Sequence, residues 1–172
     1  TPDGEIGYLY GSSGNLTQVT YPDNSTEKYH YENSSFPHSL TGITDENNTR
    51  FATWAYSVDG KVISSEHTGG VEKITFAYST NTNNEITQTT VTGALGDTRA
   101  YQFDKLKGVN KVVSISGDQC TNCGNGFMKT RTYDINGFLN GYTDWQGNQT
   151  TRINNSRGLP TQQTDAVAMS FN

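Results

Sequence analysis

The sequence has few charged residues, two cysteines and no long apolar run. Only 17% of its 172 residues are charged, and the twelve Lys and Arg residues are scattered rather than clustered. A surface that binds phosphates needs clustered basic residues, so this distribution argues against nucleic acid as a partner. No stretch approaches the roughly 18 to 20 apolar residues that a transmembrane helix needs, so we expect no membrane span.

Hydrophobic residues are also scarce, at 31% of the chain, yet the sequence does not have the composition of a disordered segment. Disordered segments usually combine a high net charge with few aromatic residues. This chain has a formal net charge of −5 and carries ten Tyr, seven Phe and two Trp. It is also rich in Thr, Gly and Asn. Because Thr and aromatic residues favour strands and Gly and Asn favour tight turns, we expect an all-β protein with a thin core.

An aromatic residue closes a short alternating run at nearly regular intervals along the whole chain. Successive spacings are 21, 25, 22, 25, 30 and 21 residues, and a period of this kind indicates a tandem repeat. The aromatic residues that we call anchors are Tyr10, Tyr31, Tyr56, Tyr78, Phe103 and Tyr133, with Asn154 in the equivalent place of a degenerate last unit.

Each unit repeats the same order of strand, tight turn, strand and looser turn. In the first strand, alternate side chains such as Ile74, Phe76 and Tyr78 share one face. A turn that usually contains Gly follows, and a second apolar run returns from it. Six or seven such units predict an antiparallel meander in which hairpins pair along their edges and the anchors pack on a shared apolar face. Four acidic residues are expected to cap turns: Asp59, Asp104, Asp134 and Asp144.

Residues 133–139 read Tyr-Asp-Ile-Asn-Gly-Phe-Leu. This segment, with Asp134 and Gly137 in place, resembles the Tyr-Asp-x-x-Gly-x-Leu signature of YD repeats in bacterial Rhs and wall-associated proteins. Similar repeats occur in teneurins and in toxin-complex shells. The pair Phe103-Asp104 keeps half of the Tyr-Asp dipeptide and Tyr31-Glu32 keeps a conservative version of it. The resemblance extends over nearly the whole chain because the anchor recurs.

The resemblance implies a fold of tandem antiparallel hairpins in a curved, spiralling open sheet that forms part of an Rhs-type shell. It implies that residues 1–172 are one array of YD repeats from a longer bacterial protein that is secreted or displayed on the cell surface. In relatives such a shell encloses or delivers a C-terminal toxin, so the expected partners are neighbouring repeats of the parent chain and an enclosed toxin domain. Unpaired strand edges are also expected to promote self-association.

Cys120 and Cys123 form the one conspicuous local motif, Cys-Thr-Asn-Cys-Gly, in the longest interval between anchors. Four interpretations stay open at this point: a structural disulfide, two free thiols at a turn, a metal site completed by another part of the parent, and redox catalysis. A zinc site normally has four ligands, and His30, His38 and His67 lie 50 or more residues upstream. A thioredoxin-like pair needs a helix start, and none is expected here.

No catalytic motif stands out, so we expect a non-catalytic protein without a cofactor. The turn acids are spread at repeat intervals, whereas a glycosidase needs two carboxylates about 5 to 10 Å apart. An alternative function is a carbohydrate- or surface-binding adhesion module, because exposed aromatic rings stack on sugar rings. Trp145, in a turn beside Gln and Asn, is the candidate glycan contact, and packing over the end of its hairpin is the competing interpretation.

Overall fold

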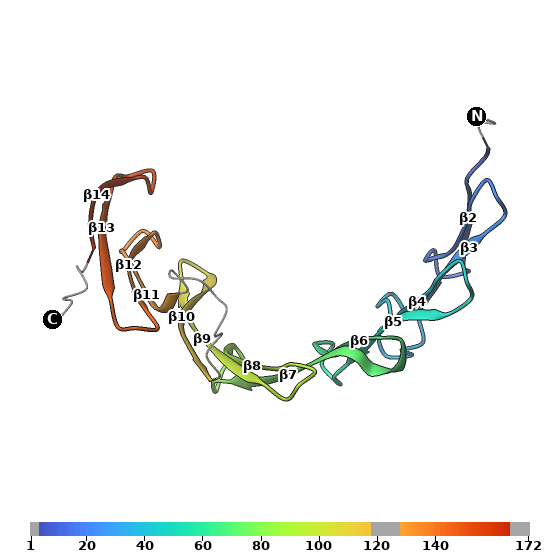
Figure 1. Cartoon of the computed structure of the whole chain (residues 1–172), viewed down its shortest axis with the longest axis horizontal. Coiled ribbons are helices and arrows are strands. Elements are labelled where there is room, and N and C mark those ends of the chain that lie inside the picture. The colour runs from blue at the N-terminus through green and yellow to red at the C-terminus, as the bar shows by residue number, and fades with distance from the viewer. Residues whose placement is uncertain (1–3, 118–127, 166–172) are drawn as a thin grey trace, which may run out of the picture. The chain divides into compact units, whose positions relative to one another are not determined.

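The computed structural model describes residues 4–117 and 128–165, and this part of the chain is all-β. Its fourteen strands form one open antiparallel sheet in which each strand pairs with its neighbours in sequence (Figure 1). The predicted fold of tandem antiparallel hairpins is therefore confirmed. Among the described residues the one helical element is a 3₁₀ turn, η1 (Thr68–Gly70), and no helix there is long and apolar enough to cross a membrane.

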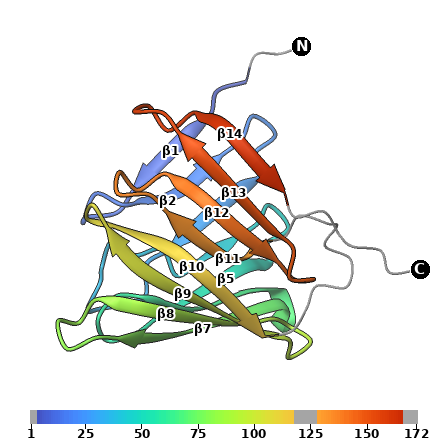
Figure 2. The same ribbon diagram turned by 90° about the vertical axis from the view of Figure 1, so that its left-hand side faces the viewer.

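The described chain divides into two compact units, residues 4–76 with 92–96 and residues 77–91 with 97–117 and 128–165. The first unit contains β1 (Gly7–Tyr10), β2 (Leu16–Thr20), β3 (Thr26–His30), β4 (Gly42–Thr44), β5 (Arg50–Tyr56), β6 (Val62–His67) and the first part of β7 (Val71–Thr80). The second contains the rest of β7, most of β8 (Ile86–Thr92), β9 (Thr98–Leu106), β10 (Val109–Gly117), β11 (Met128–Tyr133), β12 (Leu139–Asp144), β13 (Gln149–Asn154) and β14 (Pro160–Asp165). Figure 2 shows β9 to β14 following one another as adjacent strands.

One turn geometry recurs eight times within the described ranges. The N–H of the first turn residue donates to the carbonyl of the fifth, and the N–H of the fourth donates to the carbonyl of the first. The fourth residue always has a positive φ, between 59° and 91°, and is always Gly or Asn, which tolerate this conformation better than other residues. These fourth residues are Gly14, Asn24, Asn48, Gly60, Asn84, Gly137, Gly147 and Gly158.

A β-bulge precedes this turn at five places in the described sheet. At each of them the last residue before the turn pairs with the second strand after one residue of that strand is skipped, so the chain bends there. Four of the pairs involve sequence anchors, namely Tyr10 with Leu16, Tyr56 with Val62, Tyr133 with Leu139, and Asn154 with Pro160, and the fifth is Thr44 with Arg50. The sequence anchors at these four sites therefore occupy one structural position.

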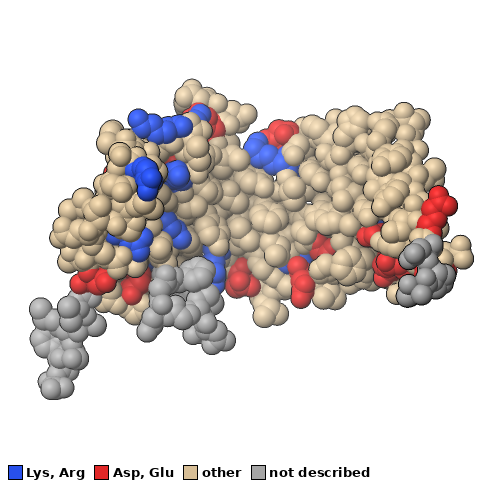
Figure 3. Space-filling model, turned by 90° about the horizontal axis from the view of Figure 1, so that it is seen from above, with Lys and Arg blue, Asp and Glu red and all other residues tan. Residues whose placement is uncertain are grey.

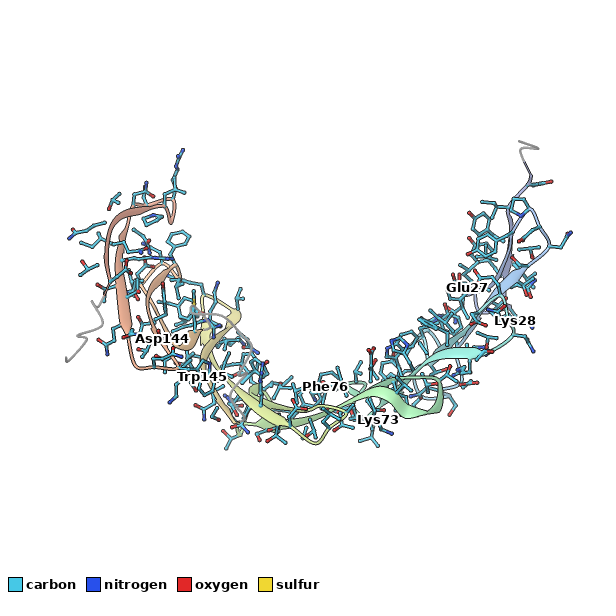
Figure 4. The ribbon with its side chains drawn as sticks, viewed as in Figure 1. Glu27, Lys28, Lys73, Phe76, Asp144 and Trp145 are labelled. Carbon is cyan, nitrogen blue, oxygen red and sulfur yellow. The ribbon has the colours of Figure 1, made fainter. Side chains whose placement is uncertain are left out.

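The core is thin, as the composition predicts. Successive residues of a strand point to opposite faces of the sheet, and Glu27 and Lys28 of β3 show this in Figure 4. The buried hydrophobic residues among those described are Val19, Ala52 and Ile115, and no described side chain is less than 2% exposed. Each unit is thus a single sheet layer, whereas most domains bury their apolar surface between two layers.

Candidate functional site

Side chains at three anchor positions each connect their own hairpin to the preceding one. Tyr56 Oη donates a hydrogen bond to the carbonyl of Leu40 (2.7 Å), and Tyr133 Oη donates to the carbonyl of Val112 (2.9 Å). Asn154 Nδ2 donates to the carbonyl of Leu139 at 3.0 Å. In each case the donor ends the first strand of one hairpin and the acceptor lies in or just before the second strand of the preceding hairpin. We call this contact the staple.

The staple has the same register at all three junctions. The residue four positions before the anchor pairs with the residue three positions after the acceptor carbonyl. Ala52 pairs with Ile43 at the β4–β5 junction, and Thr150 pairs with Tyr142 at the β12–β13 junction. The β10–β11 pairing of Ser114 with Thr130 gives the same offset. The staple is therefore a repeated feature of the sheet and not a chance contact.

Asn154 shows that the staple depends on a hydrogen-bond donor rather than on an aromatic ring. The last unit lacks Tyr at this position, yet the Asn154 side-chain amide reaches a carbonyl equivalent to those that Tyr56 and Tyr133 reach. A hydroxyl group and a side-chain amide can each donate a hydrogen bond to a carbonyl oxygen. The last unit, which looked degenerate in sequence, therefore keeps the hydrogen bond to the preceding hairpin that the Tyr56 and Tyr133 units make.

Asp134 caps the turn that follows Tyr133 and also contacts the next hairpin. Its Oδ1 accepts the backbone N–H groups of Asn136 (2.9 Å) and Phe138 (3.0 Å), and its Oδ2 accepts a hydrogen bond from Asn154 Nδ2 (3.3 Å). Partial burial raises the pKa of Asp134, but the hydrogen bonds from Phe138, Asn154 and Asn136 outweigh it and lower the pKa overall. The carboxylate is therefore held ionised as a turn cap.

The turn acids predicted from the sequence divide into two groups. Asp144 accepts the N–H groups of Gln146 and Asn148 in the same way as Asp134. Asp59 instead accepts hydrogen bonds from the side chains of Ser57 and Lys61. Asp104 is not in a turn, because β9 continues to Leu106 and Asp104 pairs with Lys111 of β10. The cap prediction for Asp104 was wrong.

Of the remaining predicted anchors, Tyr10 shares the bulge position of Tyr56 and Tyr133, whereas Tyr31, Tyr78 and Phe103 lie elsewhere in their strands or loops. Tyr10 ends β1 and is 61% exposed, and Tyr31 directly follows β3. Tyr78 lies two residues before the end of β7, so Thr80, not Tyr78, directly precedes the turn that begins at Asn81. Phe103 lies three residues before the end of β9, but it pairs with Val112, whose carbonyl receives the staple from Tyr133.

Trp145 lies in the turn after β12 and is half-buried (Figure 4). Lys129 Nζ lies 5.5 Å from the centroid of its ring, a distance at which a cation is attracted to an aromatic face. Similar pairs join Arg152 to Tyr142 and Lys111 to Tyr133. Lys and Arg side chains gather over these C-terminal strands in Figure 3. The Trp145 ring therefore has a cation from its own chain on one face.

The sequence analysis missed an ion-pair clamp on the long connection between β3 and β4. Arg50 donates two hydrogen bonds to Glu32, at 3.1 and 2.9 Å, and a third to the carbonyl of Thr41 at 3.0 Å. The Arg50 guanidinium, with help from the Thr41 hydroxyl, lowers the pKa of Glu32 to about 2 against the effect of burial. The only sequence signal was an acid after the Tyr31 anchor, and its partner lies 18 residues away.

Cys120 and Cys123 lie outside the described residues, so all four interpretations of this motif stay open.

Comparison with known proteins shows likeness in fold. No family model matches the sequence, and neither does any curated protein. Among solved structures, the Photorhabdus luminescens Tc holotoxin pore with a mutation in TccC3 matches 93% of this chain with a TM-score of 0.59 and 16% identity. A TcdB2–TccC3–Cdc42 crystal structure matches 89% of it with a TM-score of 0.55 and 18% identity. The chain spans only 9% and 7% of those two chains. Its described hairpins thus have the fold of a section of these toxin-complex proteins.

Proposed function

We propose that this chain is a wall segment of a toxin-enclosing shell in an exported bacterial protein of the Rhs and YD-repeat type. The observation that carries the proposal is the staple, which links Tyr56, Tyr133 and Asn154 each to the preceding hairpin in one register. A wall needs this kind of regular side-by-side connection. The fold likeness to toxin-complex proteins over most of the chain supports the same role.

We propose further that the role is mechanical rather than catalytic. The carboxylates that the structure describes in most detail take part in structural contacts: Asp134 and Asp144 cap turns, and Glu32 binds Arg50. Each has its pKa lowered. A general acid needs the opposite shift, toward the working pH. These groups therefore suit a structural carboxylate that stays ionised.

Protection of the polypeptide that follows this segment in the parent protein tests the wall function. Intact parent protein is treated with a protease, and the rate of cleavage of the following domain is compared with that of the same domain expressed alone. A wall predicts slow cleavage in the parent and fast cleavage after mild unfolding of the repeats. Equal rates in the intact parent and the isolated domain would rule out enclosure.

Glycan binding is the competing function, and Trp145 provides its test. Lys129 already lies over one face of the Trp145 ring, which favours packing at the hairpin end over an open sugar platform. A glycan array probed with the wild-type chain and with Trp145→Ala should show no binding that depends on Trp145. Binding by the wild type that is lost in Trp145→Ala would instead support adhesion.

A further inference from the structure

The residue two positions before each anchor is aromatic in the first five units and arginine in the last two. The five aromatic residues are Tyr8, Tyr29, Trp54, Phe76 and Tyr101. Arg131 and Arg152 hold the same position before Tyr133 and Asn154. In an array whose units otherwise repeat one pattern, a change confined to two successive units indicates a local role that the shared fold does not require.

The two arginines lie on one face of the sheet. Arg131 of β11 is directly opposite Tyr142 of β12, and Tyr142 is directly opposite Thr150 of β13. Directly opposed residues share a face, and so do residues two apart on one strand, which places Arg152 on the side of Thr150. The Arg152 guanidinium carbon lies 5.5 Å from the centroid of the Tyr142 ring. Its side chain therefore leans from β13 toward β12, in the direction of Arg131.

The positive charges of this face are not neutralised by the described part of the chain. Neither Arg131 nor Arg152 is ion-paired with a described acidic residue. Arg131 Nη1 is buried and has no hydrogen-bond partner among the residues that the structure describes, and Arg152 Nε donates to the neutral amide oxygen of Gln163 at 2.9 Å. Asp165 lies on the same face, but its carboxylate accepts hydrogen bonds from Thr150 and Gln163. A half-buried cation without a counter-charge is costly, so the face favours an anionic partner.

Apolar and aromatic side chains lie beside the two arginines. Ile115 of β10 is on the same face as Arg131, because the residues just before them in sequence pair with each other. Tyr101 of β9 pairs with Ile115, and both Tyr101 and Tyr142 are half-buried, so each keeps part of its ring exposed. The face of β9 to β13 thus combines two unpaired guanidinium groups with partly exposed rings.

We propose that this face of β9 to β13 binds an acidic segment of a polypeptide. Its carboxylates pair with Arg131 and Arg152, as Glu32 pairs with Arg50 within this chain, and its apolar side chains contact the neighbouring rings. A nucleic acid would need more clustered cations. An acidic polysaccharide is the competing partner, but Arg152 already lies over the Tyr142 ring on which a sugar would stack. The proposal does not depend on whether the sheet encloses a toxin.

Fluorescence anisotropy of a labelled synthetic peptide of Glu and Val residues, titrated with the whole chain, tests the face. We expect binding that weakens with added salt, and no binding of the matched peptide in which Gln replaces Glu. Arg131→Gln and Arg152→Gln should each weaken binding about tenfold, the effect of losing a hydrogen bond to a charged group. Arg157→Gln removes the same charge from an exposed turn and should leave the affinity unchanged. No binding of the Glu peptide, or an equal loss in Arg157→Gln, overturns the proposal.

A double variant, Arg131→Tyr with Arg152→Tyr, separates binding from folding, because it installs the aromatic residue that the first five units carry at this position. It should keep the circular dichroism spectrum of the wild type and lose the acidic peptide. Retained binding would show that the two arginines do not form the site. Polygalacturonate serves as the competitor and should displace the peptide only at a much higher concentration of carboxylate. Displacement at an equal or lower concentration would assign the face to acidic glycans and overturn the polypeptide partner.

Discussion

Tyr56 and Tyr133 place their hydroxyl groups against main-chain carbonyls at the junctions between hairpins. Both hydrogen bonds are part-buried. A main-chain carbonyl that loses its partner in such a place costs stability, because water replaces the lost hydrogen bond only in part. Asn154 provides the hydrogen bond with a much smaller side chain. We therefore expect the junction at Asn154 to be the weaker one.

Tyr133→Phe should lower the free energy of unfolding by about 1 kcal/mol, because it removes the hydrogen bond to Val112 but keeps the ring. Urea unfolding followed by tyrosine and tryptophan fluorescence measures the change. Tyr142→Phe is the matched control, since the contact recorded for Tyr142 is through its ring, with Arg152. A loss in the control as large as that in Tyr133→Phe would contradict the staple.

The role of a single residue could be predicted from the sequence where that residue acts within its own turn. Tyr133, Asp134 and Gly137 could be predicted together because the cap and the positive φ are local. The partner of Arg50 could not be predicted, because Glu32 is brought to it by two intervening strand pairings. The mistaken cap at Asp104 has a similar cause: only the pairing of β9 with β10 shows that the strand continues past it.

The hairpin turn is the element on which the repeat is built. Its first residue accepts two backbone N–H groups when it is Asp or Asn, as Asp45, Asp144 and Asn155 do. Its fourth residue supplies the positive φ. Where this pattern is replaced, the strands change length: β9 and β10 meet at a two-residue turn, Lys107-Gly108, with φ of 52° and 79°. Both values suit the tight hairpin turn that matches strand twist.

Asp134→Ala should lower the melting temperature measurably, because two turn amides and Asn154 lose their acceptor. Asp134→Asn should cost much less, since Asn155 and Asn81 accept the same amides in their own turns. Thermal unfolding monitored by circular dichroism at pH 7 compares the two variants. Equal losses would show that the turn amides do not need this acceptor.

The β3–β4 connection should lose stability in acid. Arg50 lowers the pKa of Glu32 from 4.5 to about 2, so the contribution of the ion pair is present above pH 4.5 and is lost as the pH falls toward 2. The Glu32 side chain is 59% exposed, so solvent screens the pair and the loss is small. Melting temperatures measured from pH 5 to pH 2 should fall less steeply in Glu32→Gln than in the wild type. Glu46→Gln, at an exposed turn, should follow the wild-type curve.

Element boundaries were predictable where aromatic residues alternate and less so elsewhere. The strand β8 did not stand out in the sequence, because Ile86 and Val91 are the only large apolar residues among its seven. Thr and Gln fill the rest, and they adopt strand conformation here because β7 and β9 flank them in the sheet. Pairing with neighbours thus decides the structure where the local pattern is weak.

The whole molecule differs from a compact globular domain in how little it buries. Val19, Ala52 and Ile115 are the buried hydrophobic residues of the described chain, and large apolar side chains such as Ile153 stay more than half exposed. Stability in such a sheet comes from the backbone ladder, the turns and the contacts between adjacent hairpins. As in other repeat proteins, it is then a sum of local terms.

The heat capacity change on unfolding should accordingly be small. Globular proteins show about 12 to 15 cal/mol/K per residue, mainly because unfolding exposes apolar surface. With so little apolar surface buried, this chain should fall clearly below that range. Scanning calorimetry at low protein concentration, where copies stay separate, measures the value. A result within the globular range would mean that another layer covers the sheet in solution.

The staple has a consequence for how such proteins change in length. Each staple contacts only the hairpin immediately before it. Its geometry therefore does not depend on how many hairpins the array contains. Duplication or loss of one hairpin-coding stretch would therefore preserve every remaining joint. A lineage can therefore lengthen or shorten the array one hairpin at a time, and the staple itself sets no limit on the final number.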